Sequence, residues 1–223
     1  MKNGYFIKQL FGALIFFSVI FISAGTLHFT AGIIYTALGL TMFALNHTAF
    51  KLSPELLKER SSPKENTKPW DKKILGISFL TTIAMFVIAG LDAGRFHWSP
   101  EFPTSQLILG IILTASGQLL FLIAQQQNKF FSSTVRIQTD RNHSVCDTGL
   151  YTIVRHPGYL GSLIQNLGFP ILFGSVWSFI PVAISTSLIL IRTQLEDQTL
   201  QTELTGYKEY AAKVKFKIIP FIW

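Results

Sequence analysis

The chain has 223 residues, of which 49% are hydrophobic and only 14% are charged, with a formal net charge of +7. A soluble domain usually carries about 25% charged residues, so this composition argues against a soluble globular protein and indicates that lipid surrounds much of the chain. The basic residues flank apolar runs, which favours a membrane surface over nucleic acid as their partner.

Four apolar runs are as long as the roughly 20 residues that a bilayer crossing needs. They extend over about residues 7–27, 30–50, 74–91 and 105–124. A signal peptide is the alternative for the first run, because Lys2 and Lys8 precede the apolar residues. The run is too long for a signal peptide and a second run follows almost at once, so a membrane span is the better interpretation.

A last apolar block covers residues 159–191 and is broken by glycines and prolines. It is too long for one helix and short for two full spans, which predicts a tight helical hairpin that turns near residues 173–177. The tail over residues 196–214 has apolar residues at helical spacing, which predicts an amphipathic helix on the membrane or over the cytoplasmic end. The residues from Phe216 to Trp223 are then expected to dip into the interface. The predicted fold class is therefore all-α: a polytopic membrane protein of about six transmembrane helices, with a C-terminal hairpin and an amphipathic tail helix.

Lysine and arginine are concentrated in alternate loops. The connector after the second run holds Lys51, Lys58, Arg60, Lys64, Lys68, Lys72 and Lys73. The loop after the third run holds only Arg95, whereas the stretch after the fourth run and the tail are basic again. This pattern predicts that both termini lie on the cytoplasmic side. The connector itself is expected to be solvated, with a short helix at Pro54–Arg60 because proline suits a first helical position.

Ionisable residues are sparse within the apolar runs. His47 and Asp92 lie near run ends, where a plain interfacial role is expected. An ion-coupled transporter normally carries carboxylates near the midplane of the membrane. The sequence shows none there, which argues against transport.

The most informative stretch is HSVCDTGLYTIVRHPGY, residues 143–159. Pro157 suits the start of a helix and pushes the residue before it toward an extended conformation. A helix start offers free N–H groups and a positive dipole end to an anion, and Arg155 and His156 would add donors. Tyr151 and Tyr159 would add aromatic faces for an adenine or a sulfonium. The alternative is structural: Arg155 as a membrane anchor, His156 as a cap and Pro157 as a helix start, with no ligand.

A second charged cluster follows the hairpin at Arg192, Glu196 and Asp197. Arg192 and Glu196 are four residues apart and share a helix face, so a surface ion pair of little energetic weight is the structural alternative. A hairpin brings its own two ends together. We therefore expect this cluster to meet Arg155 and His156 at one cytoplasmic boundary.

These motifs, in the order GxY, RHPxY, hairpin, RxxxE(D/E) and GYxxY, resemble the isoprenylcysteine carboxyl methyltransferase family. They are also similar to the wider group of membrane methyltransferases that includes phospholipid N-methyltransferases. The resemblance covers about Phe130 to Trp223 and divides the chain into a four-span region, 1–127, and a cofactor-binding region, 128–223. Two departures are Leu150, where many relatives have proline, and Asp197, which stands for a second glutamate.

The resemblance implies a cytoplasmic pocket for S-adenosylmethionine and a lipophilic acceptor that enters from the bilayer. Arg192 and Glu196 are the implied catalytic residues, with Arg192 on the substrate side and Glu196 on the cofactor side. The implied cofactor-binding residues are Gln138, His143, Ser144, Val145, Cys146, Tyr151, His156, Pro157, Gly158, Tyr159 and Glu196. The upstream glutamine of the family matches Gln138 or the position of Arg136. No metal is implied, and the partners are a lipophilic or lipidated substrate and membrane lipid.

The function expected is carboxyl O-methylation of an isoprenylcysteine-like substrate, in which positioning and desolvation dominate. An amine acceptor would need a base, for which Glu196 and His156 are candidates. The alternatives are a phospholipid N-methyltransferase, a sterol-type membrane reductase that uses NADPH, and a non-catalytic scaffold or small transporter. The sequence does not name the methyl acceptor.

Overall fold

The structure is a computed structural model that describes residues 2–50, 52–61 and 66–223. Its regular elements in that part of the chain are all helical, which confirms the predicted class. They are α1 (Lys2–Ala24), α2 (Thr30–Thr48), α3 (Pro54–Ser61), α4 (Pro69–Ala89), η1 (Gly90–Phe96), α5 (Thr104–Gln127), η2 (Thr139–Arg141), η3 (Gly149–Thr152), α6 (Pro157–Phe173), α7 (Phe179–Glu203) and α8 (Tyr207–Lys213). Lys51 and Lys64, two of the bases counted in the connector, lie outside the described residues.

Four of the described helices are long and apolar enough to cross a membrane. They cover Phe6–Ala24, Pro69–Phe96, Thr104–Gln127 and Phe179–Glu203. The other two predicted crossings are α2, with 19 residues, and α6, with 17. At a rise of about 1.5 Å per residue these two fall slightly short of a hydrocarbon core about 30 Å thick. The predicted hairpin is confirmed as α6 and α7, which turn between them at residues 174–178.

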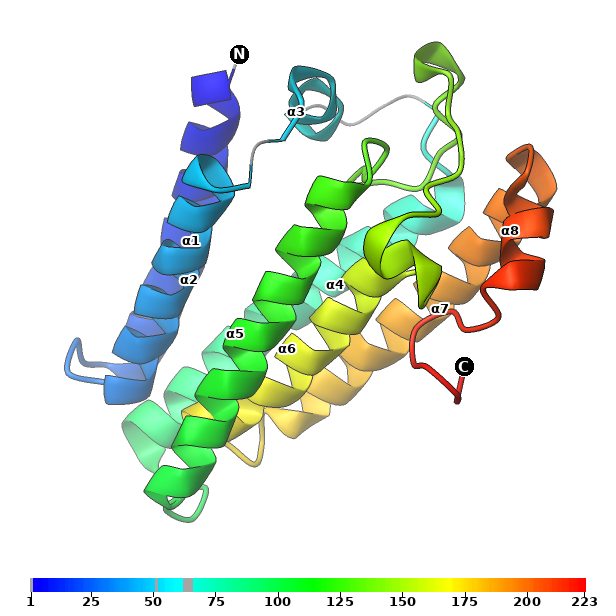
Figure 1. Cartoon of the computed structure of the whole chain (residues 1–223). Helices are drawn as coiled ribbons and strands as arrows, with labels where there is room; N and C mark the ends of the chain where they lie inside the picture. The colour runs from blue at the N-terminus through cyan, green and yellow to red at the C-terminus, as the bar shows by residue number, and fades with distance from the viewer. Residues whose placement is uncertain (1, 51, 62–65) are drawn as a thin grey trace.

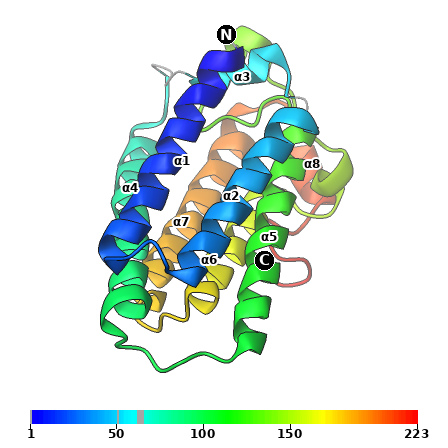
Figure 2. The same cartoon turned by 90° about the vertical axis from the view of Figure 1, so that its left-hand side faces the viewer.

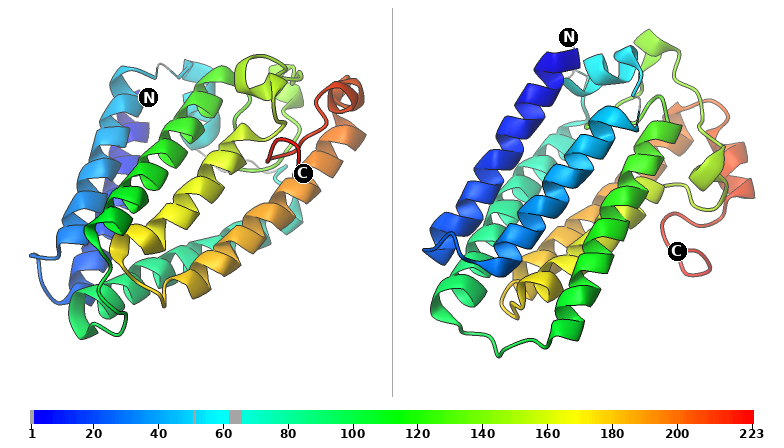
Figure 3. Two further views of the ribbon diagram at one scale, coloured as in Figure 1. Left: turned by 60° about the horizontal axis from the view of Figure 1, so that its bottom comes forward. Right: turned by 60° about the vertical axis from the view of Figure 1, so that its left-hand side comes forward.

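The long helices form one bundle with two distinct ends (Figure 1). Helices α1 and α2 lie on one side and α6 and α7 on the other, with α4 and α5 between them (Figures 1 and 2). One end carries the turns between α1 and α2, η1 and α5, and α6 and α7. The other end carries α3, residues 128–156 and α8, as the turned views also show (Figure 3). We call these the turn end and the loop end.

Glycines allow α6 to lie directly against α5. A Cβ atom added at Gly117 would lie 2.5 Å from the backbone nitrogen of Gln165, and one added at Gly161 would lie 2.6 Å from the carbonyl oxygen of Gly117. Small residues of this kind are typical of close helix pairs in membranes. The close approach fixes where α6 begins at the loop end.

The turn end is held together by Asp92. Its carboxylate accepts hydrogen bonds from the Ser99 backbone N–H at 2.8 Å and from the hydroxyls of Ser99 and Ser175 at 2.6 Å each, and its side chain is fully buried. Asp92 does lie at the end of its apolar run, as expected, but it is a buried structural residue there. Ser99 is seven residues from Asp92, but Ser175 is 83 residues away, so the sequence around Asp92 gives no sign of this second donor.

The connector at the loop end is part of the packed structure. Its predicted short helix is confirmed as α3, but Leu56 and Leu57 are buried in a cluster with Phe6 and Leu52. Glu59 is 1% exposed and forms an ion pair of 2.7 Å with Arg136. The expectation of a solvated connector is wrong here, because the partners of α3 come from distant segments.

The tail does not form one helix over residues 196–214. Helix α7 continues to Glu203, the chain turns at Gly206 with φ of +83°, and α8 folds back. Leu204, Tyr207 and Tyr210 are buried together, so the tail packs on the protein. Ile218 is also fully buried, contrary to the expected interfacial position, whereas Phe221 is 89% exposed.

Candidate functional site

A cavity of about 280 Å³ lies at the loop end, close to the lower bound of about 300 Å³ for small-molecule sites. Its wall comes from Arg60 of α3, Phe121 of α5, residues 128–146, the start of α6 with the residues before it, the end of α7 and the region of α8. All but one of the residues predicted for the site line this cavity, and the exception is Pro157. The residues in the lining are Gln138, His143, Ser144, Val145, Cys146, Tyr151, His156, Gly158, Tyr159, Arg192 and Glu196. The two ends of the hairpin thus meet at one cavity, as the sequence predicts.

The start of α6 forms part of the cavity wall. His156 precedes the helix and Pro157 is its first residue, outside the cavity lining. The amide of Gly158, in the first turn, has no partner within the helix. A Cβ atom at Gly158 would lie 2.7 Å from the Phe131 ring. The wall is therefore tight at this point and admits no larger residue without movement of Phe131.

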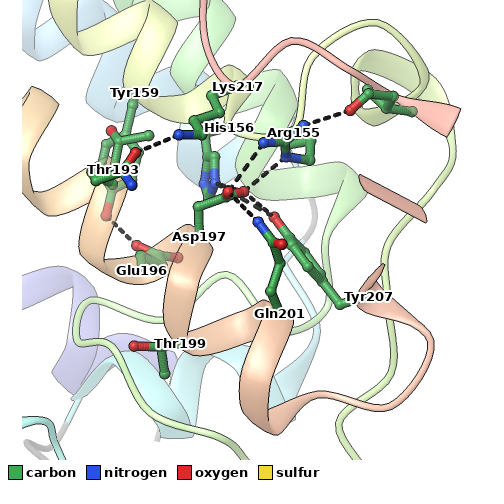
Figure 4. A network of polar contacts seen from close by, with 12 residues as sticks. Arg155, His156, Tyr159, Thr193, Glu196, Asp197, Thr199, Gln201, Tyr207 and Lys217 are labelled. Atoms are coloured by element: carbon green, nitrogen blue, oxygen red, sulfur yellow. Dashed lines mark hydrogen bonds and ion pairs between the residues drawn. The ribbon is translucent and has the colours of Figure 1, made fainter. Parts of the chain in front are cut away.

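Arg155 and His156 both contact the carboxylate of Asp197 (Figure 4). The Arg155 Nε and Nη2 atoms donate to the two Asp197 oxygens at 2.8 and 3.0 Å, and Nη1 donates to the carbonyls of Val214 and Lys215 at 2.7 and 2.9 Å. His156 Nε2 lies 3.2 Å from Asp197 Oδ1. The guanidinium of Arg155 therefore joins α6, α7 and the tail. Arg155 also lines the cavity, but these bonds already occupy most of its N–H groups, so few donors remain for a ligand.

Glu196 of α7 and Tyr159 of α6 are in direct contact, and both line the cavity (Figure 4). The Tyr159 hydroxyl donates a hydrogen bond of 2.5 Å to Glu196 Oε2, and the Tyr159 ring stacks on His156 with 5.7 Å between ring centroids. Glu196 is half-buried. Its carboxylate has further acceptor capacity, because a carboxylate has about four lone-pair sites.

Arg192 does not pair with Glu196 as its spacing suggested. Its Nε donates to Asp71 Oδ1 at 2.7 Å, and its Nη2 donates to Asp71 Oδ2 at 3.3 Å and to the Ser133 carbonyl at 3.0 Å. The guanidinium also lies 5.6 Å from the centre of the Tyr159 ring. Sequence reasoning missed Asp71; the available signal was a carboxylate at the start of the third apolar run.

Residues 128–146 wrap the remaining wall, and residues His143–Cys146 form neither a helix nor a strand. Gln138 is 1% exposed and its Nε2 donates to the Phe130 carbonyl at 2.8 Å. The His143 ring packs on Phe130 with 4.5 Å between centroids. Burial, together with the charges of Arg136 and Arg141, lowers the pKa of His143 to about 4. His143 is therefore a neutral imidazole at neutral pH.

Sequence reasoning missed most of the aromatic and hydroxyl residues of this wall. They are Phe121, Phe130, Phe131, Ser132, Ser133 and Thr134, and the amide side chain of Asn128 was missed with them. Most of them follow α5 directly, so the polar break after the fourth apolar run was the signal available for them.

Tyr151 and Cys146 complete the wall without free reactive groups. The Tyr151 hydroxyl donates to the Ala124 carbonyl at 3.2 Å, and its own carbonyl accepts from the Tyr210 hydroxyl at 2.7 Å. Burial raises the pKa of the Cys146 thiol, which keeps it protonated. Among the described residues, no three His, Cys, Asp or Glu side chains are placed to hold a metal ion.

Large parts of the chain are similar to known proteins. Residues 108–202 match the family model of isoprenylcysteine carboxyl methyltransferases. The chain is 29% identical over 150 residues to protein-S-isoprenylcysteine O-methyltransferase B of Arabidopsis thaliana, which covers 66% of this chain and 71% of that protein. It is 31% identical over 141 residues to a Delta(14)-sterol reductase of Mus musculus, which covers 57% of this chain and 33% of the reductase. A solved structure described as the eukaryotic intramembrane Ras methyltransferase ICMT is 19% identical with a TM-score of 0.46, and the match covers 97% of this chain and 85% of that chain.

Proposed function

Because the chain belongs to the isoprenylcysteine carboxyl methyltransferase family through residues 108–202 and is a membrane methyltransferase, we propose that it methylates the carboxylate of an isoprenylcysteine-like acceptor with S-adenosylmethionine. The observation that carries the proposal is the convergence of Arg192, Tyr159 and Glu196 on one cavity. Two charged groups and an aromatic face at a membrane boundary suit a charged methyl donor and an anionic acceptor.

The residues present fit S-adenosylmethionine. The Glu196 carboxylate can accept hydrogen bonds from hydroxyl or ammonium groups, and the amide of Gly158 can donate to a carboxylate at a helix start. Phe130 and Tyr159 also line the cavity and offer aromatic surface to an adenine. When bound, the cofactor supplies a methyl group whose bond to the sulfonium sulfur breaks as an acceptor oxygen bonds to the methyl carbon.

Arg192 is the group that can orient an anionic acceptor. Its Nε and Nη2 atoms are taken by Asp71 and Ser133, whereas no hydrogen bond within the described residues is assigned to Nη1. A carboxylate would bind that edge through charge-assisted hydrogen bonds. Acceptor carboxylates need no base, so positioning and exclusion of water are what the protein must provide.

An amine acceptor fits this site less well. Deprotonation of an ammonium group requires a base within hydrogen-bond reach. Of the two candidates, His156 is held by Asp197, which leaves Glu196. For this reason the carboxylate acceptor is proposed ahead of a phospholipid amine.

The loop end is proposed to face the cytoplasm. The described bases Lys58, Arg60, Lys68, Lys72 and Lys73 all lie in or next to α3 and the start of α4 at that end. The turn end carries Arg95. Bases on the cytoplasmic side are the general rule for short loops.

The direct test is transfer of a radiolabelled methyl group by the purified protein in lipid nanodiscs. The acceptors are an S-prenylated N-acetylcysteine, its uncharged amide as the matched control, and phosphatidylethanolamine. We expect label only on the carboxylate acceptor. Label on phosphatidylethanolamine alone would replace the proposal with N-methylation. Thermal stabilisation by NADPH and not by S-adenosylhomocysteine would point to a reductase.

Two variants separate the proposed roles. Arg192→Ala should lower turnover of the carboxylate acceptor by at least about 100-fold, on the scale of a lost charged hydrogen bond, while binding of S-adenosylhomocysteine stays within about twofold. Glu196→Ala should weaken that binding by about 10-fold or more. Isothermal titration and the methyl-transfer assay measure the two effects, and unchanged activity in both variants would contradict the assignment.

A further inference from the structure

Asp71 links three parts of the protein at the edge of the cavity. Its side chain is fully buried at the start of α4. One oxygen accepts from Arg192 Nε at 2.7 Å, and the other accepts from the Val135 backbone N–H at 2.7 Å and from Arg192 Nη2 at 3.3 Å. A single carboxylate thus holds a side chain of α7 and the cavity wall in a fixed relation.

The contacts of Asp71 determine which edge of the Arg192 guanidinium is available. The Ser133 carbonyl takes a further N–H of Nη2 at 3.0 Å. The guanidinium carbon also lies over the Tyr159 ring, 5.6 Å from its centre. The Nη1 edge remains for a ligand, on a side chain that lines the cavity. A free arginine side chain samples many rotamers, and these contacts hold Arg192 in one of them.

We propose that Asp71 is the positioning residue for Arg192, and that it determines the selectivity of the site for an anionic acceptor. This inference rests on the proposed function. Asp71 lies outside residues 108–202, the region that matches the family model. The N-terminal part of the chain therefore contributes to acceptor recognition through this carboxylate, although Asp71 does not line the cavity itself.

A purely structural role is the competing explanation, because Asp71 also ties α4 to α7. The chain offers a matched control. Lys68, next to the start of α4, forms an ion pair of 2.6 Å with Glu203 at the end of α7. This pair connects the same two helices at the same end without contacting Arg192. Glu203→Gln removes the ion pair and leaves the guanidinium contacts intact.

The test compares Asp71→Asn and Asp71→Glu with the control Glu203→Gln, all in nanodiscs. Binding of the S-prenylated N-acetylcysteine and binding of its amide are measured for each variant without any methyl donor. Asparagine keeps the shape and loses the charge, whereas glutamate keeps the charge and shifts the carboxylate by one methylene. We expect both Asp71 variants to lose at least about 10-fold of the preference for carboxylate over amide, as a lost charged hydrogen bond would. Glu203→Gln should keep the preference within about twofold.

The outcomes separate this inference from the proposed function. Equal loss of affinity for both ligands, an unchanged preference, or failure of both Asp71 variants to fold would overturn the positioning role and leave the proposed function standing. An unmodified protein that neither prefers the carboxylate nor methylates it would overturn the proposed function itself. In an Arg192→Lys background, Asp71→Asn should have little further effect on the preference, because the two residues act as one unit.

Discussion

The carboxylates around the cavity differ in the partners that they hold. Asp71 and Asp197 are fully buried, and each is paired with an arginine. A buried carboxylate without such a partner would be costly. Glu196 is half-buried, and its assigned hydrogen bond within the described residues comes from the neutral hydroxyl of Tyr159. Glu196 is thus the carboxylate at this site with capacity left for a ligand.

His143 should make the stability of the protein depend on pH. Burial lowers its pKa to about 4 in the folded protein, against about 6.5 in an unfolded chain. Between these values only the unfolded chain takes up the proton, so the stability that His143 contributes above pH 6.5 is lost as the pH falls toward 4. A contribution of about 1 kcal/mol would appear as about 2–4 °C in the midpoint of thermal unfolding.

The measurement is the midpoint of thermal unfolding in detergent at several pH values from about 7.5 to about 4.5, which lie around the interval between the unfolded and folded pKa of His143. His143→Gln should show a smaller decrease with falling pH than the unmodified protein. His47→Gln is the control, because His47 is exposed at the end of α2. An identical pH dependence for His143→Gln and the unmodified protein would contradict the argument.

Motif residues could be predicted from the sequence, but their partners could not. His156, Tyr159, Arg192 and Glu196 stand in recognisable local patterns, and all four line the cavity. Asp71 is 121 residues from Arg192 along the chain. No local spacing connects such a pair, whereas the spacing of Arg192 and Glu196 suggested a pair that the structure does not form.

At the scale of helices, the contact between α5 and α6 positions the start of α6 and should be sensitive to one methyl group. Gly117→Ala would place a Cβ atom 2.5 Å from the Gln165 backbone nitrogen and 2.6 Å from the Gly161 carbonyl oxygen. Backbone cannot move aside as a flexible side chain can, so overpacking should cost about 1–3 kcal/mol. Gly76→Ala is the matched control in α4, since nothing lies within 4 Å of an added Cβ atom there. Thermal unfolding should show a lower midpoint for Gly117→Ala alone, and equal midpoints for the two variants would contradict this packing.

The helices themselves could be predicted because each apolar run is long and bounded by polar residues. The tail could not be predicted, because its hydrophobic spacing continues through the break at Gly206. Leu204 lies before the break and Tyr207 and Tyr210 lie after it, yet all three join one buried cluster. A turn that returns the chain to the same surface keeps the spacing of a continuous helix.

At the scale of the whole molecule, the N-terminal region contributes to the site. Arg60 of α3 lines the cavity and donates to the Phe131 carbonyl at 3.1 Å, and Glu59 pairs with Arg136. The division into regions 1–127 and 128–223 stays a prediction. These contacts show that the two regions together build the cavity wall.

The orientation of the bundle can be tested with introduced cysteines, because Cys146 is the single cysteine of the chain. In a Cys146→Ser background, Lys58→Cys places a thiol on α3 at the loop end, and Glu101→Cys places one between η1 and α5 at the turn end. Both positions are exposed. The test uses sealed vesicles that enclose the cytoplasmic face and a maleimide that cannot cross the membrane. With the basic loop end in the cytoplasm, the maleimide should label Glu101→Cys directly. It should label Lys58→Cys only after detergent is added. The reverse pattern would place the cavity on the opposite side, and its acceptor would then have to come from outside the cytoplasm.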